Sequence, residues 1–183
     1  MELRDLKKIS EQHKDKLQKI KVCAFDVDGI LTDGRVWWAG EEIGWNRSFN
    51  IRDGYGMKVL QRAGYKVGVI SGGNSVGLRK RFVENLGLDF MYQGSEDKRG
   101  SFLELMNEGY AAQEILYMGD EHFDIPLLKR AGFSATVPEA CVDVKSIVDY
   151  VTQIEGGRGA AREVIDLLRY ACDIYPEIPD FEN

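Results

Sequence analysis

Short apolar runs that are rich in β-branched residues alternate with helical patterns along most of this chain, and this alternation restricts its fold more than any other feature. The apolar runs predict strands at 22–25, 67–70, 89–92, 115–118, 133–137 and 148–151. The helical patterns cover 54–64, 76–86, 98–107, 125–130 and 158–172. Strands that alternate with helices in this way form a parallel sheet covered on both faces. The sequence therefore predicts an α/β protein with a Rossmann-like, doubly wound parallel sheet.

One segment breaks the alternation. Residues 34–50 carry Trp37, Trp38 and Trp45 around Gly40, without the spacing of a helix. Apolar residues on both sides of a glycine-containing turn are typical of two antiparallel strands. We therefore expect a β-hairpin that projects from the sheet.

The two ends of the chain differ in composition from the middle. Residues 1–21 are charged almost throughout, but an apolar stripe that starts at Leu3 predicts a helix over 3–20, so this part is expected to be a helical extension. Residues 175–183 contain two prolines and several acids, which predicts a flexible tail. Residues 22–174 are then one domain of ordinary size.

The charge balance excludes some classes of protein. The chain of 183 residues has 24 Lys and Arg against 30 Asp and Glu, a net charge of −6 that disfavours non-specific binding to nucleic acid. Its apolar runs are far shorter than the roughly 20 residues of a membrane helix, and the charged first 21 residues do not resemble a secretory signal. We expect a cytoplasmic protein with neither nucleic acid nor a membrane as partner.

The cysteines and histidines indicate no metal site of their own. Cys23 lies in an apolar strand and Cys172 follows an apolar helix stripe, so both are interpreted as core residues, and no pair that includes Cys141 has metal-ligand spacing. His13 and His122 are too few and too far apart in the chain for a zinc site.

Polar residues gather at or just beyond the ends of four predicted strands. In chain order they are Asp26, Asp28, Ser71, Gly72, Lys98, Asp120, Glu121 and Asp124. The carboxyl ends of parallel strands meet at one edge of a sheet, where ligands bind. Taken singly, each cluster is more simply explained as a turn or a helix cap. Their common position at one edge favours a shared site.

The chemistry of this set points to a phosphoryl group. Several carboxylates beside a lysine and a hydroxyl are understandable if they hold Mg²⁺, since the ion, the lysine and the hydroxyl together neutralise a phosphoryl group. A carboxylate then attacks phosphorus to form an aspartyl-phosphate. A second acid protonates the leaving oxygen and later activates water. The residues thus predict Mg²⁺-dependent phosphate chemistry.

The order of these residues resembles the haloacid dehalogenase superfamily of phosphatases. Four further blocks resemble, more narrowly, the 3-deoxy-D-manno-octulosonate 8-phosphate phosphatase family; they are Asp-Val-Asp-Gly-Ile-Leu-Thr-Asp-Gly at 26–34, Phe-Asn-Ile-Arg-Asp-Gly-Tyr-Gly at 49–56, Tyr-Gln-Gly at 92–94 and Gly-Gly-Arg-Gly-Ala at 156–160. The resemblance covers about residues 20–173. It implies a phosphatase of a sugar acid phosphate in lipopolysaccharide sugar biosynthesis, and a homotetramer with active sites near subunit interfaces.

The resemblance also assigns roles to residues. Asp26 is implied as the nucleophile and a metal ligand, and Asp28 as the general acid/base that lends its backbone carbonyl to Mg²⁺. Ser71, Gly72 and Lys98 are implied as phosphate-binding residues. Asp120 is the remaining metal ligand, and Asp124 and Glu121 support that site.

The sequence does not determine which sugar acid phosphate is the substrate. An acidic sugar phosphate needs further cations, for which Arg81, Arg52 and Arg158 are the candidates. Gly73 departs from the family, because octulosonate phosphatases commonly carry arginine there and some phosphatases of nine-carbon sugar acids carry glutamate. A nine-carbon acid 9-phosphate thus stays open as an alternative substrate, and a non-catalytic scaffold as an alternative function.

Many members of the superfamily cover the site with an inserted cap domain. Here the stretch from Asp26 to Ser71 is already filled by the hairpin and a helix, and that from Ser71 to Lys98 by a helix and a strand. The sequence therefore predicts that no cap domain is present. A site for phosphoryl transfer has to exclude water, and the hairpin or a neighbouring subunit is the expected cover.

Overall fold

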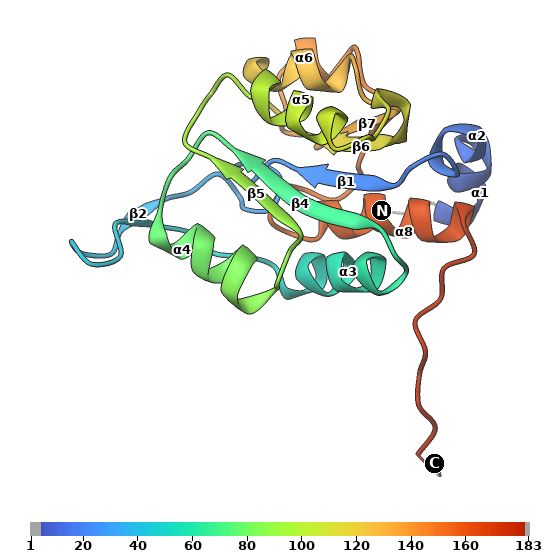
Figure 1. The fold of residues 1–183 in the computed structure, drawn as a ribbon, viewed down its shortest axis with the longest axis horizontal. Coiled ribbons are helices and arrows are strands. Elements are labelled where there is room, and N and C mark those ends of the chain that lie inside the picture. The colour runs from blue at the N-terminus through green and yellow to red at the C-terminus, as the bar shows by residue number, and fades with distance from the viewer. Residues whose placement is uncertain (1–4, 182–183) are drawn as a thin grey trace.

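The structure is a computed structural model that describes residues 5–181. At its centre is a parallel sheet of six strands in the order β5-β4-β1-β6-β7-β8 (Figure 1). The strands are β1 (Val22–Phe25), β4 (Lys66–Ser71), β5 (Phe90–Gln93), β6 (Ile115–Met118), β7 (Phe133–Thr136) and β8 (Tyr150–Val151). The predicted Rossmann-like, doubly wound α/β fold is confirmed.

Helices cover both faces of the sheet. One face carries α3 (Ile51–Arg62), α8 (Ala160–Ala171), α4 (Val76–Arg79) and the π-helix η1 (Lys80–Asn85), and the other α5 (Arg99–Asn107) and α6 (Ile125–Leu128) (Figure 1). The shorter elements are α1 (Leu6–Gln12), α2 (Lys14–Leu17), α7 (Val142–Lys145) and the 3₁₀ turns η2 (Ala112–Glu114) and η3 (His122–Asp124). Helix α8 contacts both α1 and α3, so the N-terminal extension packs on the domain. No helix among residues 5–181 is long and apolar enough to cross a membrane.

Several predicted helices have other bounds. The helix expected over 3–20 is broken at His13, whose φ of −111° and ψ of 9° leave the helical region and whose ring packs edge-on against Phe133; Leu3 lies outside the described residues. Helix α3 starts earlier than predicted because the Asn50 side chain accepts the N–H of Arg52 and caps it. The helix expected over 76–86 changes to π-helical geometry at Lys80, and α7 was not predicted.

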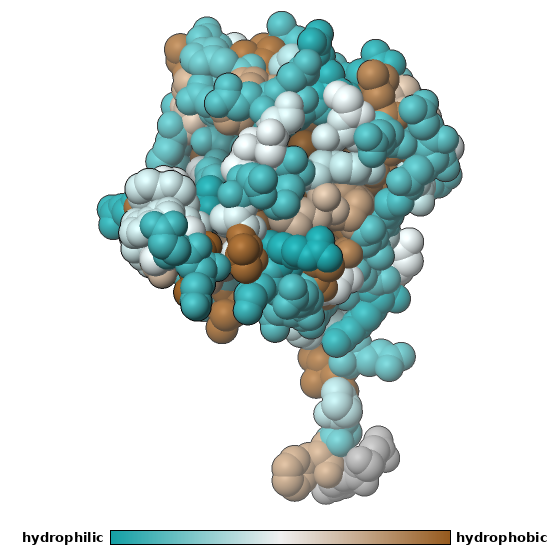
Figure 2. Space-filling model, turned by 60° about the vertical axis from the view of Figure 1, so that its left-hand side comes forward, coloured by the Kyte–Doolittle hydropathy of each residue, from teal (hydrophilic) through white to brown (hydrophobic). Residues whose placement is uncertain are grey.

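Residues 34–50 form the predicted hairpin. Strands β2 (Trp37–Trp38) and β3 (Trp45–Asn46) are antiparallel, and the rings of Trp38 and Trp45 meet edge to face at 5.6 Å. The hairpin projects beyond the sheet at the left of Figure 1. Figure 2 turns that side forward, and weakly polar and apolar residues lie there among hydrophilic ones. All three tryptophans of the hairpin are about half exposed.

The order of the strands fixes where a site forms. Strand β1 is fully buried and lies between β4 and β6, so the chain leaves it toward one side of the sheet and later returns on the other. This reversal opens a crevice at the carboxyl end of β1. From β1 to β4 the chain builds only the hairpin and α3, and from β4 to β5 only α4 and η1. Neither stretch holds a cap domain, as predicted.

Candidate active site

Asp26 lies at the centre of the crevice, directly after β1. Its backbone N–H extends the sheet ladder by donating to the carbonyl of Met118 at 2.8 Å. Its side chain is buried, and Oδ1 accepts the N–H of Val27 at 2.7 Å and lies 2.8 Å from Nζ of Lys98. The carboxylate is thus held by the strand end on one side and by a cation on the other.

Lys98 is a fully buried ammonium group held between carboxylates. It stands at the N-cap of α5, and Nζ lies 2.7 Å from Oδ1 of Asp124 as well as close to Asp26. The ring of Phe123 covers the ammonium at 4.5 Å. The hydroxyl of Tyr117 donates to the same Asp124 oxygen at 2.6 Å. A buried lysine needs such partners, and these contacts fix its position.

Asp124 also organises the loop after β6. Its Oδ2 accepts the backbone N–H groups of Asp120 and Glu121, each at 3.1 Å. This turns Asp120 toward the crevice, where its Oδ1 is buried and has no hydrogen-bond partner among the described residues. The Asp120 side chain can lie this close to the loop after β1 because residue 29 is glycine: a Cβ on Gly29 would lie 2.1 Å from Oδ2 of Asp120.

These three carboxylates repel one another. One oxygen each of Asp26, Asp120 and Asp124 lies within 4.8 Å of the others. Burial first, and then the charge of Asp124, raise the pKa of Asp26 well above its ordinary range, although Lys98 acts against this. The same two causes raise the pKa of Asp120 to about 7. One lysine therefore does not balance the cluster.

A divalent cation fits this place. Mg²⁺ is bound by oxygen ligands, mostly carboxylates, and it keeps them ionised. The unpartnered Oδ1 of Asp120 and the excess of negative charge beside Asp26 are what such an ion would satisfy. The donors are all oxygens, so they suit a hard cation rather than zinc.

Ser71 and Asp28 face a common space from two strand ends. Ser71 is buried at the end of β4, and its Oγ accepts the N–H of Gly73 at 3.1 Å. A Cβ on Gly73 would lie 3.5 Å from Oγ of Ser71 and 3.3 Å from Oδ2 of Asp28. Gly72 follows Ser71 in the chain, and a Cβ on it would lie 3.6 Å from Cγ of Glu96. A hydroxyl, a loop amide and a carboxylate thus gather around Gly73, where a guanidinium group also lies.

Arg47 is a site residue that the sequence reasoning missed. Its Nε and Nη2 donate to Oδ1 and Oδ2 of Asp28 at 2.5 and 2.8 Å, a two-pronged ion pair. Arg47 follows β3 in the hairpin, where no motif or periodicity marks it. The sequence offered one weak signal for Arg47: it is a cation in a hairpin that follows an acidic motif.

The side chain of Glu121, which the resemblance assigns to support of the metal site, makes its hydrogen bond locally. It accepts the N–H of His122 at 2.8 Å, with an oxygen 2.6 Å from Nδ1 of the same histidine, while its charge still contributes to the raised pKa of Asp120. Only the backbone N–H of Glu121 reaches Asp124. The structure also brings Cys141 to 3.8 Å from Nε2 of His122, a proximity that spacing along the chain did not predict.

Arg81 lies near the buried carboxylate of Asp53 in α3 and lines a small hollow with it. Its Nη1 donates to the side chain of Asn85 at 2.6 Å, and its guanidinium lies 5.9 Å from the ring centre of Phe49. Burial lowers the pKa of Arg81, and its Nε is buried without a partner among residues 5–181.

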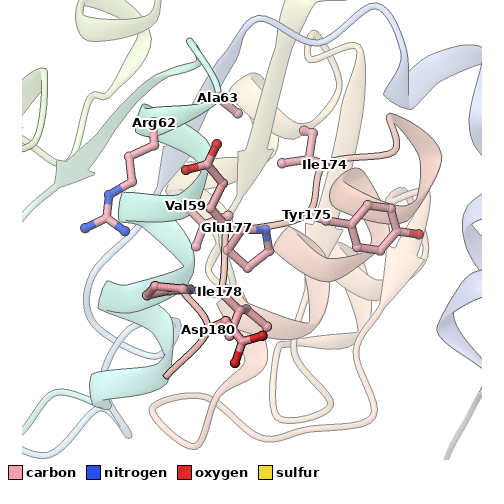
Figure 3. A pocket seen from close by; sticks show the side chains of 10 residues that line it. Val59, Arg62, Ala63, Ile174, Tyr175, Glu177, Ile178 and Asp180 are labelled. Carbon is pink, nitrogen blue, oxygen red and sulfur yellow. The ribbon is translucent and has the colours of Figure 1, made fainter. Parts of the chain in front are cut away.

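Arg52 and Arg158 line a different hollow of about 320 Å³, together with Arg162 at the start of α8. A larger hollow of about 960 Å³ lies between α3 and residues 174–180, and Figure 3 shows its lining side chains. Neither lining includes Asp26 or any other residue of the carboxylate cluster.

Known proteins of similar sequence cover most of the chain. The 3-deoxy-D-manno-octulosonate 8-phosphate phosphatase of Haemophilus influenzae is 39% identical over 159 residues, 85% of this chain and 86% of that one. The enzyme of the same name from Escherichia coli strain K12 is 36% identical over 159 residues, 85% of this chain and 82% of that one.

Solved structures that resemble this chain include phosphatases of the same name. A crystal structure of 3-deoxy-D-manno-octulosonate 8-phosphate phosphatase from Moraxella catarrhalis, in complex with magnesium, phosphate and the sugar acid, superposes with a TM-score of 0.84 at 32% identity and covers 89% of this chain and 93% of that one. The cobalt-bound enzyme from Haemophilus influenzae gives a TM-score of 0.81 at 38% identity, covering 86% and 92%.

The profile of the haloacid dehalogenase-like hydrolases matches residues 91–163, which include Lys98, Asp120 and Asp124. With the sheet and the carboxylate cluster at its edge, this defines a hydrolase of the haloacid dehalogenase-like class. The identity to the relatives extends over most of both chains. The chain belongs to the 3-deoxy-D-manno-octulosonate 8-phosphate phosphatase family, as the motifs predicted.

Proposed function

We propose that this protein is a Mg²⁺-dependent phosphatase that hydrolyses 3-deoxy-D-manno-octulosonate 8-phosphate to the free sugar acid and phosphate. One observation carries the proposal: at the edge of the sheet, buried Asp26 lies 2.8 Å from Lys98 and within 4.8 Å of a carboxylate oxygen of Asp120, which keeps one buried oxygen without a hydrogen-bond partner among the described residues. A nucleophile, a fixed cation and a carboxylate set for a metal ion are thereby within reach of one phosphoryl group.

Asp26 is assigned the attack on phosphorus. Its carboxylate forms a bond to phosphorus while the bond from phosphorus to the sugar oxygen breaks, which leaves an aspartyl-phosphate on Asp26. The ammonium group of Lys98, 2.8 Å away, favours the ionised carboxylate before attack and offsets the charge of the phosphoryl oxygens during it. The hydroxyl of Ser71 and the N–H of Gly72 are assigned to the same oxygens.

Asp28 is assigned the proton transfers. It gives a proton to the sugar oxygen as that oxygen leaves. It then takes a proton from water, whose oxygen attacks phosphorus and releases phosphate and the carboxylate of Asp26. Asp28 lies two residues after Asp26 at the same strand end, and this position supports the assignment.

Mg²⁺, when bound, neutralises charge on the phosphoryl group. Asp26, Asp120 and the backbone carbonyl of Asp28 are the residues assigned to hold it. Asp124 is assigned a supporting role, because it binds Lys98 and two N–H groups of the Asp120 loop.

The sugar acid is the anionic part of the proposed substrate, and its carboxylate requires a cation. Arg81, Arg52 and Arg158 stay the candidates, but they do not adjoin the carboxylate cluster of their own chain. A homotetramer whose active sites lie near subunit interfaces would let a neighbouring chain supply them. The half-exposed tryptophans of the hairpin are apolar surface of the kind that such interfaces bury. The proposed place of action is the cytoplasm, in lipopolysaccharide sugar biosynthesis.

Phosphate release from a panel of sugar phosphates, with and without Mg²⁺, tests the proposal. We expect Mg²⁺-dependent release, fastest from 3-deoxy-D-manno-octulosonate 8-phosphate. Asp26→Asn should abolish release while the circular dichroism spectrum stays unchanged. Appreciable activity of this variant would remove Asp26 as the nucleophile.

The panel also separates two alternatives. Because Gly73 has no side chain, nothing at this position distinguishes an eight-carbon from a nine-carbon acid, so a neuraminate-type 9-phosphate belongs in the panel. A preference for that compound would keep the mechanism and change the substrate. No release from any compound would favour a scaffold without catalysis.

A further inference from the structure

Arg47 is a buried charge on an exposed hairpin. Its side chain is only 8% exposed, although Trp45, two residues before it, is 54% exposed. A guanidinium that leaves water in this way needs a partner of opposite charge, and here Asp28 takes that role with both oxygens. The Arg47 side chain therefore turns inward because its partner, Asp28, is a residue of the active site.

The ion pair fixes the orientation of Asp28. Besides Arg47, the carboxylate receives only a long hydrogen bond of 3.4 Å from the hydroxyl of Thr32, among the described residues, and it is 36% exposed. Without the two parallel bonds, the Asp28 side chain would be free to rotate toward water. An ionised carboxylate has about four lone-pair directions, so two remain for proton transfer when a guanidinium occupies the others.

Gly73 leaves the room in which this pair forms. A Cβ at residue 73 would lie 2.7 Å from Nη2 of Arg47, so the end of the arginine side chain would have to shift, and 3.3 Å from Oδ2 of Asp28. The guanidinium is further braced by the carbonyl of Trp45 and the hydroxyl of Ser75, at 3.3 and 3.4 Å from Nη1. The hairpin, the loop after β4 and the loop after β1 thus meet at one guanidinium group.

We infer that Arg47 is a positioning residue that holds the Asp28 carboxylate in its working orientation, so that the hairpin belongs to the catalytic apparatus and Gly73 is small in order to admit it. The inference rests on the proposed function, since it takes Asp28 as the proton-transfer group.

The first test does not depend on turnover. Thermal unfolding is measured for Arg47→Met, Asp28→Asn and the double variant, with Arg35→Met as the matched control, because Arg35 is an exposed arginine near the same hairpin. We expect the shift in melting temperature of the double variant to be smaller than the two single shifts combined, because either change alone already breaks the pair. Additive shifts would overturn the inference.

The second test measures kcat and KM with the phosphate monoester that the wild type hydrolyses fastest. Arg47→Met should lower kcat at least tenfold, but by less than the roughly 10²- to 10⁴-fold that a positioned acid–base group contributes, while KM changes less than about threefold. Arg47→Lys should recover part of kcat, because it keeps the charge without the fork. In the Asp28→Asn background, Arg47→Met should have no further effect.

Gly73→Ala gives an independent check from the other side of the pair. It should lower kcat in the wild type and have no effect in the Arg47→Met background. A rise in KM with unchanged kcat for Arg47→Met would mean that Arg47 binds substrate instead, and would refute the positioning role. A protein that couples Arg47 to Asp28 in stability but hydrolyses no phosphate monoester would refute the proposed function, and with it the catalytic use of the pair.

Discussion

The repulsion among the buried carboxylates leads to an unusual expectation: Asp120→Asn should make the metal-free protein more stable. Asp120 is a carboxylate whose pKa rises from 3.8 to about 7 on folding, because it is buried beside Asp124. The folded chain therefore holds this proton more tightly than the unfolded chain. Stability from this residue is fully present below about pH 4 and is lost as the pH rises to about 7.

The size of the effect follows from that shift. Each pKa unit corresponds to about 1.4 kcal/mol, so a rise of roughly three units gives a limit of about 4 kcal/mol at pH 8. The side chain keeps some solvent contact, which reduces the expected gain to about 2–4 kcal/mol. For a chain of this size, this is a rise in melting temperature of roughly 5–15 °C. Asparagine keeps the shape of the side chain and removes the charge.

Thermal unfolding in a chelating buffer at pH 5 and pH 8 measures this. Asp120→Asn should exceed the wild type at pH 8 and by less than half that margin at pH 5, while excess Mg²⁺ should raise the melting temperature of the wild type much more than that of the variant. Asp15→Asn, which changes an exposed carboxylate in α2, is the control and should stay within about 0.5 kcal/mol. A variant less stable than the wild type at pH 8 without metal, or stabilised equally by Mg²⁺, would refute the reasoning.

Three further changes test other parts of the site. Lys98→Met leaves buried carboxylates without their cation and should cost about 3–5 kcal/mol in urea unfolding; a loss below 1 kcal/mol would contradict the buried pairing. Tyr117→Phe removes a hydrogen bond to a charged group and should cost about 1.5–3 kcal/mol by the same assay, and a neutral effect would show that Asp124 does not need it. Trp37→Ala with Trp38→Ala should weaken the proposed oligomer in analytical ultracentrifugation and lower activity in parallel, whereas a fully active monomer would exclude the hairpin as a shared cover.

The sheet was predictable because its signal is local. Strands β1 and β6 have the predicted bounds. The apolar run of β1 ends before the charged Asp26, and the apolar run of β6 ends before Gly119. The positions of the carboxylates, Ser71 and Lys98 then follow from the rule that parallel strands share a carboxyl edge. Helix α3 was misplaced at its start because the cap at Asn50 depends on one side-chain hydrogen bond rather than on periodicity.

The parts that were not predicted depend on side chains that meet from distant segments. Arg47 reaches Asp28 only because the hairpin folds back over the strand end, and no pattern near residue 47 encodes this. The contact of Glu121 with the His122 ring was likewise not predicted, because no spacing rule joins two neighbouring residues in this way.

The central place of β1 has a consequence for synthesis of the chain. Val22 pairs with Lys66 on one side and with Ile115 on the other, so the strand made first is flanked by a partner that leaves the ribosome late. Until then β1 keeps an open edge, and the proposed nucleophile next to it is not enclosed by the Asp124 that holds Lys98. Such distant pairing slows folding. A nascent chain of which fewer than about 125 residues have left the ribosome should therefore be open to proteases, and resistance should appear only when β6 and the loop after it have emerged.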